Sequence, residues 1–249
     1  MGKNNFLFPQ QSHLEMIKGA LAELGAAGAF KPPVTRQEGV WEAEIYSSSG
    51  AIFEKATVAR VDLCGGLVEE APTDITLLQA FAWPANPHVP GMIIMASASS
   101  TEGADPIITF FTDLIMQNGA ARQADKDAFT AALLAACQQH GQDIVEYQSF
   151  MAGRGMLGEC AAECGMLYFF EQSDAALLAD IIQAPLKAYA GIIGAAAPAP
   201  APGDFAAMKN NRKKIIDWML TQDYGVKVSR QNNIPMEVIE AYSFPPVSS

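Results

Sequence analysis

Positive charge and histidine are both scarce in this sequence of 249 residues. It has 16 lysines and arginines against 27 aspartates and glutamates, a formal net charge of −11, and 3 histidines. Because binding to nucleic-acid phosphates depends on clustered lysine and arginine, this balance argues against a nucleic-acid partner. The one basic cluster, Arg212–Lys213–Lys214, is short, and we predict that it lies on a solvated helix face.

Cysteines are few, and phosphate-binding glycine loops are absent. The four cysteines, Cys64, Cys137, Cys160 and Cys164, follow no zinc-site spacing, so we expect no metal. Cys160 and Cys164 would share one face if their stretch were helical, and core packing is favoured there over a metal or redox pair. No GxGxxG or Walker-type loop signals a nucleotide, and we expect no bound cofactor.

Long apolar runs are also missing, although 50% of the residues are hydrophobic. No run reaches the ~18 residues typical of a membrane span, and residues 1–5 lead into no secretory segment. We therefore expect a cytoplasmic protein without a membrane span, folded as a single domain over residues 1–249. Ala195–Gly203, which alternates alanine and proline, is predicted to be a stiff surface loop.

Alternating and helical patterns of apolar residues divide the rest of the chain into elements. Strands are predicted at Trp41–Tyr46, Ala51–Val58, Ile75–Trp83, Met92–Ala98, Ile107–Asp113 and Met166–Glu171, near Val226, and at Met236–Phe244. Helices are predicted after a Ser12–Glu15 capping box, from Asp125 to His140, across Ile144–Met151, from Asp174 (capped by Ser173) to Ile193, and from Asp204 to Leu220. Hairpin-length links favour an α+β fold with a single large antiparallel sheet covered by helices on both faces.

Four segments carry motifs in a fixed order along the chain. They are GAIFEKA at 50–56, WPANPHVP at 83–90, the helix end Ala131–Gly141, and the stretch Arg212–Pro246. Together they resemble the aerobic coproporphyrinogen III oxidase family over roughly residues 40 to 249. The resemblance implies an α/β/α sandwich, a homodimer, and a tetrapyrrole ligand linked to heme biosynthesis. The bilin reductases share this general architecture.

The family's polar active-site residues are mostly replaced in this chain. Ile93, Met95 and Ser97 stand where the resemblance would place histidine, asparagine and arginine. The stretch 158–163 stands where the family has an arginine-rich segment, and Asp113 is retained. Arginine forks suit carboxylates, so their loss makes decarboxylation of a tetra-anionic substrate an unfavoured reading.

We therefore predict a site for a tetrapyrrole or another flat apolar molecule. Asp113 is the predicted catalytic residue, and the predicted ligand-binding residues are Ile93, Met95, Ser97, Cys160, Cys164 and His88. The alternatives without a functional role are that Asp113 caps a turn and that His88 is a solvent-facing loop residue. Methionines in these segments are core filling by default, or line an apolar cleft: Met92, Met95, Met116, Met151, Met156 and Met166.

Three functions stay open at this point. The first is an oxidoreductase of the bilin reductase kind, with Asp113 as its acid or base. The second is a non-catalytic carrier whose pocket is closed by Ile93, Met95 and Cys160. The third is the parent decarboxylase, which would need several arginines in one cleft, drawn from Arg122, Arg154, Arg212 and Arg230.

Overall fold

The computed structural model describes residue 6 and residues 8–25, 30–102, 104–119, 121–142, 158–171, 174–195 and 197–246. Its centre is a seven-stranded sheet in the order β1 to β7, in which every neighbouring pair is antiparallel. The strands are β1 (Val34–Glu38), β2 (Trp41–Ser48), β3 (Phe53–Val68), β4 (Ala71–Pro84), β5 (Gly91–Thr101), β6 (Ile107–Ile115) and β7 (Met166–Glu171).

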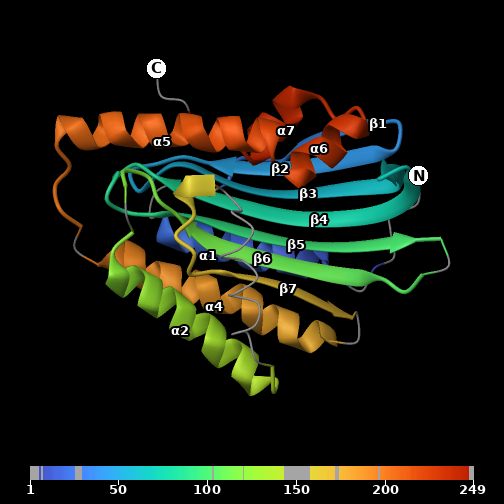
Figure 1. Ribbon diagram of the computed structural model, residues 1–249, viewed down its shortest axis with the longest axis horizontal. Helices are drawn as coiled ribbons and strands as arrows, with labels where there is room; N and C mark the ends of the chain where they lie inside the picture. Colours follow the sequence, from blue (N-terminus) through green and yellow to red (C-terminus); the bar gives the residue numbers. More distant parts are fainter. Residues whose placement is uncertain are drawn as a thin grey trace.

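Helices cover both faces of this sheet, as Figure 1 shows. One layer consists of α1 (Gln11–Leu24), α2 (Gln123–Gln139) and α4 (Ala175–Gly194). The other consists of α5 (Pro202–Thr221), α6 (Tyr224–Gln231) and α7 (Met236–Tyr242), with a short 3-10 turn η1 (Gly158–Cys160) beside α5. The predicted α+β class, with one antiparallel sheet between helical layers, is confirmed.

Alternation along the strands separates two hydrophobic cores. On β4, Leu78 and Ala80 pack in the core under α1, α2 and α4, whereas Phe81 and Trp83 pack in the core under α5 to α7. We call these sides of the sheet the α1 face and the α5 face. A residue's place on a strand therefore fixes which helical layer it meets.

Helix α4 is long and apolar enough, by length and composition, to cross a membrane. Its side chains account for that composition, because Leu178, Ile181, Ile182 and Tyr189 are fully buried in the core of the α1 face. The tyrosine hydroxyl also donates to the carbonyl of Pro90 at 2.9 Å. Packing against the sheet thus explains the hydropathy of this helix.

The predicted C-terminal strands are wrong, because α6 and α7 occupy this part of the chain. The Asp223 carboxylate caps α6 by accepting from the backbone N–H of Val226 at 2.8 Å. In α7, Val238, Ile239 and Tyr242 are buried at helical spacing. Valine and isoleucine suggested strands there, but the caps and the burial periodicity are helical.

Other element boundaries also differ from the predictions. Strand β1 was missed, and Ser12, Asp125 and Asp204 lie within the first turns of their helices and not at the N-caps. The Asp204 carboxylate nevertheless holds the start of α5, accepting from the backbone N–H of Ala201 at 2.8 Å. The predictions for Ile144–Met151 and for Ser173, Met151, Met156 and Arg154 lie outside the described residues.

Candidate functional site

Two of the predicted ligand residues, Met95 and Ser97, lie on the α5 face of β5. The register of the sheet places Gln79 and Phe111 beside Met95, and Leu77 and Thr109 beside Ser97. Phe169 of β7 continues the second row next to Thr109. We call the group Leu77, Gln79, Met95, Ser97, Thr109 and Phe169 the strand surface.

The strand surface is accessible and uncharged. Leu77, Gln79, Met95, Ser97 and Thr109 are half-buried, and Phe169 is 46% exposed. Next to it on the same face, Ile107 is 56% exposed. Three strand spacings of ~4.8 Å make this surface about 14 Å wide from β4 to β7, which suits a flat four-ring molecule. Its six side chains could supply apolar contact and three neutral hydrogen-bonding groups, but no ion pair.

Asp113 and Ile93 lie opposite each other in the sheet, in the row next to Met95 on the same face. Both are buried, at 1% and 3% exposure. The Oδ1 of Asp113 accepts from the backbone N–H of Leu114 at 2.7 Å and from that of Cys164 at 3.2 Å, and its Oδ2 accepts from the N–H of Glu163 at 3.2 Å. These bonds hold the segment before β7 against β6.

Burial raises the pKa of the Asp113 carboxyl from 3.8 to about 6, against the opposing effect of its hydrogen bonds with Cys164, Leu114 and Glu163. The group therefore exchanges a proton close to neutral pH. It can act as an acid or base only for a ligand that reaches past Met95. Its catalytic role stays a prediction.

The two predicted cysteines do not share a helix face, because their stretch is not helical, and the favoured prediction of core packing is confirmed for both. Only residues 158–160 form a helical turn, and Ala161 bridges to Ile115 as extended chain. Cys160 packs in the core of the α5 face, with its Sγ 3.7 Å from the carbonyl of Asn211. Cys164 packs in the other core, with its Sγ 3.3 Å from the Oδ1 of Asp113.

Both thiols are poor metal ligands in this setting. Burial raises the pKa of Cys160, and burial together with the nearby Asp113 charge raises that of Cys164, so both remain protonated at neutral pH. Within the described residues, no three histidine, cysteine, aspartate or glutamate side chains gather in a way that could hold a metal ion.

His88 lies in the loop that follows Pro84 at the end of β4, away from the strand surface. Its Nε2 is 3.1 Å from the Oδ2 of Asp204 at the start of α5, and its Nδ1 is 3.0 Å from the Nδ2 of Asn118. Both ring nitrogens are engaged, so this histidine connects two loops to α5. The structure does not bring it together with Met95 or Ser97.

The prediction for Arg212 is wrong. The residue was predicted on a solvated face, yet it is 2% exposed and forms an ion pair of 2.6 Å with Glu54. The other described arginines of the decarboxylase hypothesis lie elsewhere, since Arg122 pairs with Asp125 on α2 and Arg230 donates to the carbonyl of Leu220. These three arginines do not meet in one cleft.

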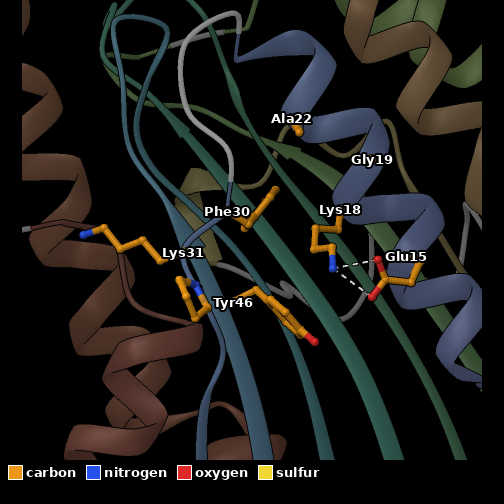
Figure 2. Close-up of a pocket in the computed structure, with 8 residues that line it drawn as sticks. Glu15, Lys18, Gly19, Ala22, Phe30, Lys31 and Tyr46 are labelled. Carbon is orange, nitrogen blue, oxygen red and sulfur yellow. Dashed lines mark hydrogen bonds and ion pairs between the residues drawn. The ribbon is translucent and has the colours of Figure 1, made fainter.

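A depression of about 410 Å³ opens on the α1 face, between α1 and β2. Figure 2 shows Lys18 bound to Glu15, with Phe30 and Tyr46 forming the neighbouring wall. The Lys18 ammonium lies 4.3 Å from the centre of the Tyr46 ring. None of the eight described residues that line this depression is a predicted site residue, and it lies on the side of the sheet opposite the strand surface.

No protein-family model matches the sequence, and no curated protein matches it either. A solved structure does resemble the fold. It is phytochromobilin synthase from tomato in complex with biliverdin, with a TM-score of 0.62 and 11% identity, covering 92% of this chain and 80% of that chain. The TM-score and coverage show a shared fold, and identity this low leaves residue roles to be argued from this chain.

Proposed function

We propose that this protein binds a flat tetrapyrrole, such as a bilin or a porphyrin, on the strand surface. The observation that carries the proposal is an accessible, uncharged patch about 14 Å wide, made by side chains of β4 to β7. Ligand sites are mostly apolar with a few polar groups, and Gln79, Ser97 and Thr109 supply such groups here.

Two further observations support a tetrapyrrole over other flat molecules. The tomato protein of similar fold was solved with biliverdin. The motif order resembles the coproporphyrinogen oxidase family, whose substrate is also a tetrapyrrole, and we propose that this chain is a divergent relative of it. Met95 adds a polarisable thioether, which makes favourable contacts with conjugated rings.

The test is an absorbance and fluorescence titration with biliverdin, heme, coproporphyrin III and protoporphyrin IX. We expect a saturable spectral shift at micromolar concentration with at least one of them. Ser97→Glu should weaken binding at least tenfold, because a ligand on this surface would bury the new carboxylate without a partner. Thr35→Glu, on the exposed strand β1, is the matched control and should leave affinity unchanged.

A second variant separates the two faces of the sheet. A Cβ at Gly19 would have no heavy atom within 4 Å, so Gly19→Leu can fill the α1 depression without a backbone clash. It should leave tetrapyrrole binding unchanged. If no tetrapyrrole binds, the proposal fails. If Gly19→Leu weakens binding and Ser97→Glu does not, the ligand lies on the α1 face and the strand-surface site is wrong.

A second candidate function is reduction of a bilin, which the raised pKa of Asp113 favours. Two equivalents of an external one-electron donor and two protons, one from Asp113 and one from solvent, would saturate one double bond. Asp113→Asn should then retain binding and lose turnover under anaerobic conditions with a chemical reductant. Equal, measurable turnover by both proteins would rule out Asp113 as the proton donor, and no turnover by the unmodified protein would leave binding alone as the function.

A further inference from the structure

A tetrapyrrole on the strand surface needs a cation that the surface itself lacks. Bilins and porphyrins of biological origin carry carboxylates on an otherwise apolar ring system. A carboxylate that loses its water needs a charged or hydrogen-bonding partner. The following inference therefore rests on the proposed function and concerns the stretch of α5 beside η1, at the end of β6 next to the Asp113 row of the same face.

The helical periodicity of α5 divides its side chains into three stripes. Met208, Arg212, Ile215 and Met219 are buried against the sheet. Successive residues turn by about 100°, so Asn211, Lys214 and Trp218 share one flank of this buried stripe. Lys213 lies on the opposite flank.

Two contacts fix the direction in which the first flank points. The carbonyl of Asn211 is 3.7 Å from the Sγ of Cys160, and the Nζ of Lys214 is 3.1 Å from the Oε2 of Glu159. Both partners belong to η1, which Figure 1 places beside α5. The flank therefore points towards β6, because the residue after η1, Ala161, bridges to Ile115 at the end of β6.

Trp218 follows Lys214 by one helical turn on this flank. It is partly buried and packs against the core of the α5 face. The pair thus combines an ammonium group with an aromatic ring along the border between α5 and the β5–β6 part of the sheet. An aromatic ring provides a stacking surface for a conjugated ligand.

We infer that Lys214 pairs with a carboxylate of the bound tetrapyrrole and that Trp218 packs against its ring system. In the free protein Glu159 pairs with the Lys214 ammonium group, and the ligand carboxylate displaces Glu159 from it. The exchange costs little, because the Lys214 and Glu159 side chains are 60% and 83% exposed and such surface pairs are weak. The site thereby selects tetrapyrroles that carry a free acid at this border.

The experiment compares biliverdin with its dimethyl ester, which has the same chromophore and no free acid. Lys214→Met should weaken biliverdin binding about tenfold and change ester binding by less than about twofold. Lys213→Met is the matched control, an exposed lysine on the opposite flank, and should change neither. Glu159→Gln should tighten biliverdin binding about two- to threefold, because it removes the competing carboxylate.

Four results would overturn this inference. Equal weakening of acid and ester by Lys214→Met would mean a packing role, and equal effects of Lys213→Met and Lys214→Met would mean a general charge effect. Unchanged biliverdin affinity in Lys214→Met would place the carboxylates elsewhere while the proposed function stands. Failure of the unmodified protein to bind any tetrapyrrole would overturn both proposals together.

Discussion

Arg212 is the centre of a buried network of five hydrogen bonds to four residues, and its removal is a sharp test of the architecture. Its guanidinium donates to Glu54 at 2.6 Å, to the side-chain oxygen of Gln117 at 2.7 and 3.2 Å, and to the carbonyls of Pro84 at 3.2 Å and Pro246 at 3.3 Å. One side chain on α5 thus ties together the start of β3, the end of β4, the loop after β6 and the C-terminal segment.

Arg212→Met keeps much of the side-chain volume and deletes every donor. The side-chain oxygen of Gln117 (2% exposed) would then be buried without its arginine partner, at a cost of about 1–3 kcal/mol. Breaking a fully buried ion pair costs about 3–5 kcal/mol. The Glu54 side chain is 29% exposed and regains some hydration, so we expect a total loss of about 3 kcal/mol.

Urea unfolding at pH 7 measures this loss as a difference in unfolding free energy. Lys213→Met, on the exposed flank of the same helix, is the control and should change stability by less than ~0.5 kcal/mol. Glu54→Gln keeps a hydrogen-bond acceptor for Arg212 but leaves the buried guanidinium without its counter-ion, and should cost about 2 kcal/mol. A loss below ~1 kcal/mol for Arg212→Met would refute the view that this network stabilises the fold.

Three further predictions follow from buried or constrained positions. Burial raises the pKa of Asp113 in the folded chain to about 6, above its value of 3.8 in the unfolded chain. Its protonated carboxyl therefore stabilises the fold fully below about pH 4, and this stabilisation is lost as pH rises through about 6. Unfolding free energies of wild type and Asp113→Asn should therefore diverge by up to about 3 kcal/mol between pH 4 and 7, and parallel profiles would contradict this. Gly165→Ala would place a Cβ 1.7 Å from the Thr112 carbonyl oxygen and should destabilise by more than about 2 kcal/mol in urea unfolding, whereas a neutral effect would mean that the backbone shifts freely. Asp223→Ala removes the N-cap bond to Val226, and thermal unfolding should show a loss of about 1 kcal/mol; no loss would mean that packing alone holds α6.

Strand alternation made the sheet predictable, and glycines limited the prediction of strand length. Ala51–Val58 and Ile75–Trp83 were predicted as separate short strands, yet β3 and β4 extend to meet at a tight turn. The register shifts between Leu63 and Gly66, where Gly65 has φ +66°. This bulge breaks the period of two, so the sequence beyond it no longer shows a strand pattern.

How deeply each site residue is buried was less predictable than the face of the sheet on which it lies. Alternation places Ile93, Met95 and Ser97 on one side of β5, and the structure agrees. It cannot show which of them is covered, because that depends on segments distant in sequence. Arg212 is the same case, since Glu54 and Gln117 lie 158 and 95 residues away.

Depth also decides what Asp113 can do. The Oδ1 of Asp113 accepts from two backbone N–H groups and lies 3.3 Å from a thiol, whereas its Oδ2 accepts from one N–H at 3.2 Å. Because a carboxylate oxygen can accept more than one bond, Oδ2 is the atom with capacity left for a ligand. A tetrapyrrole on Met95 and Ser97 therefore exchanges a proton with Asp113 only if it reaches the Oδ2 side of the carboxylate. Binding without turnover is expected for any ligand that stops at Met95. Whether the ligand reaches Asp113 therefore decides whether the same surface serves a carrier or an enzyme.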